Sequence, residues 1–209
     1  MRIVKPAEER KNEILDVAEE LFAEKGFDNA STNDIIKRIG IARGTLYHHF
    51  SSKEEILDAL VDRMTNEGIA RFRAIIKERK VPLLERLSAA MISLRIESRA
   101  GFEVLEQIHK PQNALLHQKM QDKLLKGVVP FIAELIKEGN EEGLFHSKYP
   151  MEAAEMIMLY SGTAFDDLNE LTPKETERKS KAFISHTERI LGAKENCLKA
   201  VIEKLIKRK

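Results

Sequence analysis

The sequence predicts an all-α protein, with an N-terminal three-helix helix-turn-helix domain followed by a C-terminal helical bundle. Its longest stretches place apolar residues at the 3.6-residue spacing of amphipathic helices. Charged residues make up 33% of the 209 residues and aromatic residues 6%, with six prolines and no tryptophan, which together with that spacing favours helices. Residues 31–53 combine two short helical patterns, a tight turn and the start of a long third helix. Helices this short need a third helix to pack against, as in a helix-turn-helix.

The first two helices have clear start and stop signals. The first is expected over about residues 7–25, where Gly26 provides the stop. The second begins with the capping-box spacing of Ser31 and Asp34, and Gly40 ends it in a left-handed conformation. The buried face of the first helix is marked by apolar residues at helical spacing: Ile14, Ala18, Leu21 and Phe22.

The helix after the turn is expected over Arg43–His49. Its apolar position Leu46 and the following Phe50 should be buried. Ser52 and Glu55 have the spacing of a second capping box, so the long third helix should begin beside them. The remaining side chains of Arg43–His49 are left to face outward.

The C-terminal part reads as a bundle of helices separated by glycine and proline. We place the domain boundary between residues 52 and 53, which gives domains of residues 1–52 and 53–209. Gly101 is expected to end one helix, and Pro130 should kink another. The predicted helices of this part cover about residues 53–80, 82–101, 101–110, 112–142, 150–168, 173–191 and 195–208.

The outward face of the Arg43–His49 helix has the chemistry of a nucleic-acid reader. Arg43 can reach a guanine edge or a phosphate, and Thr45 offers a hydroxyl or a methyl group to a base. Gly44 permits close approach of the backbone, and polar-tipped rings suit phosphate oxygens. The first turn of the following helix also favours a phosphate. The expected DNA-contacting residues are Thr32, Arg43, Gly44, Thr45, Tyr47, His48 and Lys53.

The run IGIARGTLYHHFSSKEEIL resembles the DNA-binding signature of the TetR family of transcriptional repressors. The resemblance extends back through EILDVAEELFAEKGFDNAST and covers about the first 60 residues. It implies that the outward face of Arg43–His49 lines the DNA surface and that Lys53 touches a phosphate. Ala42 departs from the pattern, because many members carry a serine there that caps the recognition helix; losing such a cap costs about 1 kcal/mol.

The same resemblance implies a ligand-responsive homodimeric repressor. Its partners would be double-stranded DNA with a roughly palindromic operator, a second copy of the chain, and a small-molecule effector of partly apolar type that releases the DNA. The dimer face is expected over Pro150–Leu168 and Lys174–Leu191, because two helices from each subunit can bury a four-helix interface. Pocket candidates, chosen by size and helix face, are Met91, Phe102, Ile108, His109, Met120, Phe131, Met156 and Tyr160.

The charge is concentrated near the proposed reader. The formal net charge of +1 does not by itself indicate a nucleic-acid binder, but residues 29–53 contain four basic residues and one acidic residue.

The composition also indicates the cellular compartment. The single cysteine, Cys197, excludes an intrachain disulfide and fits a reducing cytoplasm. No apolar run approaches the ~18 residues of a membrane span, and the N-terminus lacks the apolar segment of a secretory signal. We therefore expect a soluble cytoplasmic protein without membrane contact.

Other kinds of site lack support. His48 and His49 point about 100° apart on a helix and cannot share a metal ion, and the remaining histidines lack metal-ligand spacing. The neighbouring carboxylates of Asp166 and Asp167 diverge in the same way, so we expect no metal, no cofactor and no enzymatic activity. Two alternatives stay open: an architectural or division-linked DNA-binding protein of the same fold without an effector, and an enzyme with a helix-turn-helix accessory unit.

Overall fold

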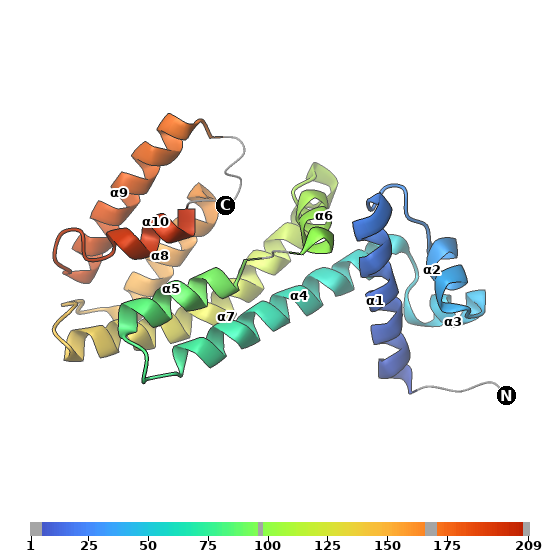
Figure 1. Ribbon diagram of the computed structural model, residues 1–209, viewed down its shortest axis with the longest axis horizontal. Coiled ribbons are helices and arrows are strands. Elements are labelled where there is room, and N and C mark those ends of the chain that lie inside the picture. The colour runs from blue at the N-terminus through green and yellow to red at the C-terminus, as the bar shows by residue number, and fades with distance from the viewer. Residues whose placement is uncertain (1–5, 96–97, 166–170, 207–209) are drawn as a thin grey trace. The chain divides into compact units, whose positions relative to one another are not determined.

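The computed structural model describes residues 6–95, 98–165 and 171–206, and within them every regular element is a helix (Figure 1). This confirms the all-α prediction. A short 3-10 helix, η1 (Pro111–Asn113), precedes the longest α-helix. The α-helices of the described chain are α1 (Ala7–Lys25), α2 (Thr32–Ile39), α3 (Arg43–His49), α4 (Lys53–Ile76), α5 (Leu83–Ser93), α6 (Arg99–Ile108), α7 (Ala114–Glu141), α8 (Pro150–Ala164), α9 (Pro173–Leu191) and α10 (Lys199–Ile206).

The chain divides into two compact units, each built from two stretches of sequence. The reader unit comprises the described residues of Met1–Asn66 and Ile96–Met120, and the bundle unit comprises those of Glu67–Arg95 and Gln121–Lys209. The long helices α4 and α7 contribute residues to both units. The domain boundary expected between residues 52 and 53 falls where α4 begins, and it stays a prediction.

One apolar core holds the reader unit together. The predicted face of α1 is buried in it, as are Leu46 and Phe50 at α3. The ring of Phe27 packs edge-on against that of Phe22, with 5.0 Å between the ring centroids. Residues of α6, among them Ile108, complete the same core. This shared burial stabilises α2 and α3, which are too short to be stable alone.

The capping box predicted at the start of α2 is confirmed. The Asp34 amide donates to Ser31 Oγ at 3.2 Å, and the Ser31 amide donates to the Asp34 carboxylate at 2.9 Å. Gly40 ends the helix with a φ of 76°, a left-handed conformation that favours glycine. These local signals therefore set both ends of α2.

The second predicted capping box is wrong in one half. The Glu55 amide donates to Ser52 Oγ at 3.1 Å, as expected. The Glu55 carboxylate, however, accepts from the amide and the hydroxyl of Ser51, both at 2.6 Å. The glutamate side chain is long enough to bond one residue further back than the pattern assumes.

Two predicted helix ends in the middle of the chain are also wrong. The helix predicted over about residues 82–101 corresponds to α5, which ends at Ser93 and does not continue to Gly101. Gly101 instead lies inside α6, because the Ser98 hydroxyl accepts from the Gly101 amide at 3.0 Å and caps a new helix there.

The last predicted helices agree with the structure less evenly. The helices α8 and α9 begin at the predicted prolines, and Gly192 ends α9 with a φ of 62°. The last helix begins at Lys199 instead of Glu195. Its expected end at Arg208, the Asp166–Asp167 pair and the last residues of the expected dimer face up to Leu168 lie outside the described residues.

The bundle unit is formed around a second apolar core from α4, α5 and α7 to α10. Arg86 on α5 is 2% exposed and donates to the carbonyls of Ile76 and Val81, each at 2.9 Å, and it pairs with Glu138 on α7. These bonds fasten the end of α4 and the following turn to α7. In the described part of the chain, no helix has the length and apolarity needed to cross a membrane.

Candidate nucleic-acid interface

The seven-residue helix α3 is buried on one side and open on the other. Leu46 is fully buried, whereas Arg43, Gly44, Tyr47 and His48 are exposed and Thr45 is half-buried. The sequence therefore predicted correctly which side of α3 is free. We call the outward side of α3, together with Thr32 at the start of α2, the α2–α3 surface.

Tyr47 joins the two helices of the α2–α3 surface. Its hydroxyl lies 3.3 Å from Thr32 Oγ1, at hydrogen-bond distance. The Arg43 guanidinium carbon lies 5.4 Å from the centre of the Tyr47 ring. The hydrogen bond with Thr32 and, next, the interaction with Arg43 lower the pKa of Tyr47 below its ordinary value. The three side chains are thus held in one polar group before any partner binds.

The start of α3 is open. Ala42 occupies the N-cap position and supplies no side-chain hydrogen bond, as the sequence indicates. A Cβ atom placed on Gly44 would meet nothing within 4 Å. A helix start without a side-chain cap leaves backbone amides available to an acceptor on a partner.

Basic side chains near this surface differ in how their charge is used. Arg38 forms a bidentate ion pair with the Glu24 carboxylate, with N···O distances of 3.0 and 2.8 Å, so its charge is compensated. Lys25 lies 2.8 Å from the Asp34 carboxylate, and this contact together with Ser31 holds the pKa of Asp34 well below its usual range. In contrast, Arg43 forms no ion pair within the described residues.

Lys53 lies where it was expected, in the first turn of α4, but its ammonium group is occupied. It donates to the carbonyls of Phe27 at 2.8 Å and Ala30 at 2.9 Å and lies 4.2 Å from the centre of the Phe27 ring. Lys53 therefore holds the turn between α1 and α2. Its contact with a phosphate stays a prediction.

The bundle unit contains a cavity of about 210 Å³. Residues of α5, α7, α8, α9 and α10 line it, and the described lining is almost wholly apolar. The side-chain hydroxyls in this lining are those of Ser161 and Thr187, and none of the described lining residues is charged. A dry cavity of comparable size, ~150 Å³, holds benzene, so this one has room for a small apolar molecule.

Of the eight predicted pocket residues, Met91 lines this cavity and the others do not. In the reader unit, Phe102 is 59% exposed, while Ile108 and Met120 belong to the core and the ring of His109 packs on that of His117. In the bundle unit, Phe131 faces the Arg73 guanidinium, and Met156 and Tyr160 are exposed. The sequence missed the contribution of α9 and α10, although the stripe Leu198, Ile202 and Leu205 was a visible signal.

A larger hollow of about 390 Å³ lies in the reader unit, between the end of α1 and α6. Its lining is mostly charged or polar, and two of its carboxylates, Glu24 and Asp28, are paired with Arg38 and Lys110. This hollow does not suit an apolar ligand. Among the residues that the structure describes, no group of three histidine, cysteine, aspartate or glutamate side chains could hold a metal ion.

A helix pair with one side buried and a preorganised polar side, Thr32–Tyr47–Arg43, defines a helix-turn-helix protein. Comparison with known families agrees: residues 14–60 match the model described as "Bacterial regulatory proteins, tetR family", and residues 98–185 match "Tetracyclin repressor-like, C-terminal domain". The chain belongs to the TetR family of transcriptional regulators, which is not a family of enzymes.

Individual relatives support this assignment. The chain is 36% identical to the HTH-type transcriptional repressor KstR2 of Mycobacterium tuberculosis over 108 residues, which is 52% of this chain and spans only half, 50%, of that protein. It is 31% identical to the "Fatty acid metabolism regulator protein" of Bacillus subtilis over 134 residues, 63% of this chain and 68% of the relative.

Solved structures share the fold. The fatty acid degradation regulator FadR from Bacillus halodurans superposes with a TM-score of 0.59 at 23% identity, covering 98% of this chain and 97% of that one. Salmonella enterica GusR superposes with a TM-score of 0.57 at 20% identity, covering 92% and 100%. At these identities the likeness establishes the fold and leaves the ligand open.

Proposed function

We propose that this chain is a ligand-responsive homodimeric repressor that reads a roughly palindromic operator through α3. The observation that carries this proposal is the α2–α3 surface, whose polar side chains are held in place while the opposite side of α3 is buried. Such a surface has the size and chemistry to enter a major groove.

Each residue of the α2–α3 surface has a proposed role. Arg43 contacts a guanine edge, because its guanidinium is exposed and free of ion pairs within the described chain. Thr45 contacts a base, and Gly44 allows the backbone to approach. Phosphate oxygens are bound by the remaining polar groups of this surface, Thr32, Tyr47 and His48. Lys53, in the first turn of α4, also binds a phosphate oxygen, in exchange for one of its carbonyl partners.

Dimerisation through α8 and α9 is supported by exposed apolar side chains. Met156, Leu159 and Tyr160 on α8 are 58%, 54% and 50% exposed, and Ile190 on α9 is also exposed. Large apolar side chains gathered on two neighbouring helices are typical of an interface. A two-fold dimer presents two copies of α3 to two half-sites, which is why we expect an inverted-repeat operator.

The effector proposed for the bundle unit is apolar, in keeping with the lining of its cavity. Relatives whose names refer to fatty acid metabolism and degradation make a hydrocarbon compound a reasonable class to screen. The effector changes DNA affinity only through a difference in its affinity for the two conformations of the repressor. The proposed division of labour is therefore DNA reading by residues 1–52 and effector binding and dimerisation by residues 53–209.

The experiment that tests this function is selection of bound duplexes from a random pool at about 0.15 M salt, where non-specific phosphate contacts are weakened. Enrichment of an inverted repeat is the expected result. The matched control is the Arg43→Ala variant, which should enrich a repeat with one position relaxed in each half-site. Binding without any enriched motif would contradict the proposal and favour an architectural DNA-binding protein.

A further inference from the structure

The apolar cavity of the bundle unit has one wall that differs from the others. Helix α10 contributes Leu198, just before its first turn, and then Ile202 and Leu205, which form one stripe along the cavity. With eight residues, α10 is too short to be stable without its contacts. It packs against α5 and α9 (Figure 1). The wall is therefore a short helix held by its neighbours.

Two charged side chains hold α10, one at each end. At the N-terminal end, the Glu188 carboxylate on α9 accepts from the amides of Asn196, at 3.1 Å, and Leu198, at 2.9 Å. Glu188 is 5% exposed, so these bonds lie away from water. They satisfy amides just before the first turn that have no partner inside the helix.

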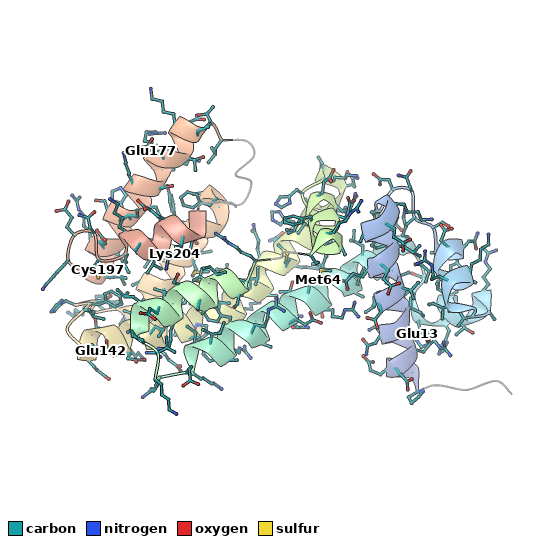
Figure 2. The ribbon with its side chains drawn as sticks, viewed as in Figure 1. Glu13, Met64, Glu142, Glu177, Cys197 and Lys204 are labelled. Carbon is teal, nitrogen blue, oxygen red and sulfur yellow. The ribbon has the colours of Figure 1, made fainter. Side chains whose placement is uncertain are left out.

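At the C-terminal end, Arg95 donates from its guanidinium to the carbonyl of Lys204 at 2.9 Å and also to that of Leu205. Lys204 is labelled on α10 in Figure 2. A negative group at the N-terminal end and a positive group at the C-terminal end both complement the helix dipole. Glu188 on α9 and Arg95, just after α5, therefore hold opposite ends of α10, and we call these two side chains the clamps.

The cavity behind α10 selects a chemical class. A charged ligand group would be buried there without a partner, at a large cost in free energy, because no charged residue is part of the described lining. The Ser161 hydroxyl donates to the Met158 carbonyl at 3.0 Å, which leaves its oxygen free to accept. The lining therefore suits an uncharged molecule that is mostly hydrocarbon, with one hydroxyl group placed near Ser161 or Thr187.

We propose that α10 is the movable wall through which a small, uncharged, mainly hydrocarbon ligand enters this cavity, and that Arg95 and Glu188 hold the wall closed. This rests on the proposed function in taking the cavity as the effector site. Opening requires the Arg95 bonds to break. Arg95 is also the last residue of the bundle-unit stretch that precedes Ile96–Met120 of the reader unit, so opening frees the residue at which the chain passes between the units.

The test uses the full chain and the uncharged probe N-phenyl-1-naphthylamine, whose fluorescence rises in apolar surroundings. Stopped-flow mixing gives its entry and exit rates. In Arg95→Ala, both rates should rise about tenfold with little change in affinity, because charge-assisted hydrogen bonds that close the wall are lost. The matched control is Arg71→Ala, which removes a guanidinium bonded to the Ser93 carbonyl. Its rates should equal those of the wild type.

Hydrogen exchange supplies a second measurement that does not need a ligand. Amides of α10 should exchange about tenfold faster in Arg95→Ala and in Glu188→Gln, since each variant weakens one clamp. The control Glu177→Gln removes a carboxylate paired with Lys181 on the exposed part of α9 and should leave α10 unchanged. Unchanged exchange in both clamp variants would overturn the proposal.

The location of the probe is tested with Ser161→Phe, which fills the cavity, and with Lys137→Ala, which alters the exposed side of α7, another helix that lines it. Loss of probe binding in the first variant alone supports the proposal. Binding with wild-type rates in Arg95→Ala overturns the movable wall but leaves the effector site standing. If the wild type does not bind the probe, the assignment of the cavity as the effector site is overturned together with the movable wall. The proposed function fails separately, when selection from random DNA gives no inverted repeat.

Discussion

The hydroxyl of Tyr47 on α3 lies 3.3 Å from Thr32 Oγ1 on α2, so a side chain of the recognition helix is bonded to the helix before it. The same ring lies 5.4 Å from the Arg43 guanidinium carbon. Ala42 gives α3 no side-chain cap. The Tyr47–Thr32 contact therefore supplies part of the order that a capping residue would otherwise provide, and it orders the side that we propose faces DNA.

Arg43→Ala should relax base preference at one position of each half-site by about 1–3 kcal/mol, because a bidentate contact to guanine is lost. The measurement compares affinities for the selected operator and for its single-base variants. Arg38→Ala is the control, since that guanidinium is already paired with Glu24. An unchanged preference in Arg43→Ala would reassign Arg43 to a phosphate.

Tyr47→Phe should weaken binding to all DNA sequences alike, by about 0.5–1.5 kcal/mol, the value of one hydrogen bond. The lost hydroxyl orders the surface and contacts a phosphate, and neither role reads a base. Dissociation constants for the operator and for an unrelated duplex, at one salt concentration, should rise by the same factor. The control is Tyr149→Phe in the bundle unit. A change in the ratio of the two constants would show that Tyr47 takes part in base reading.

The limits of α2 and α3 could be predicted because short-range signals decide them. Ser31 with Asp34 starts α2 and Gly40 ends it, and these residues are close in the chain. The side of α3 that carries Arg43 and Tyr47 followed from the burial of Leu46. Local chemistry was therefore sufficient to predict which side of α3 is exposed.

Lys53 shows what short-range reasoning could not give. Its ammonium binds the carbonyls of Phe27 and Ala30, which are 26 and 23 residues away in the chain. Most of the cavity lining was missed for a related reason. Because α8 is apolar on several sides, periodicity could not decide between Met156, which is exposed, and Ile157, which lines the cavity.

Gly44→Ala should separate folding from DNA binding. A Cβ at this position meets nothing within 4 Å, and alanine is the better helix former, so the free energy of unfolding should rise by about 0.5–1 kcal/mol. DNA affinity should fall, because the added methyl group stands where we propose the backbone approaches DNA. Urea unfolding and operator binding measure the two effects. Undiminished affinity would exclude a close approach at Gly44.

The Asp34 carboxyl should make folding sensitive to acid. Its contacts with Lys25 and Ser31 lower its pKa in the folded chain, so the stabilisation is present above the ordinary pKa of an aspartate, about 3.9, and is lost as the pH falls below it. Asp34→Asn should therefore lower the melting temperature at pH 7, and the difference from the wild type should shrink below about pH 4. The exposed Glu78→Gln serves as control. A difference that stays constant with pH would exclude this role of the carboxylate.

Gly139→Ala should destabilise the bundle unit, in contrast to Gly44→Ala. A Cβ on Gly139 would lie 2.2 Å from Cδ2 of the buried Phe145 ring, and a rigid ring cannot move aside as a flexible side chain would. Overpacking of this kind costs about 1–3 kcal/mol, which exceeds the gain from replacing a helical glycine by alanine. Urea unfolding measures the loss, and adding Phe145→Leu should recover part of it because the smaller side chain makes room. If Gly139→Ala raised the free energy of unfolding as Gly44→Ala is expected to, then α7 and the Phe145 ring would not pack as closely as the structure indicates.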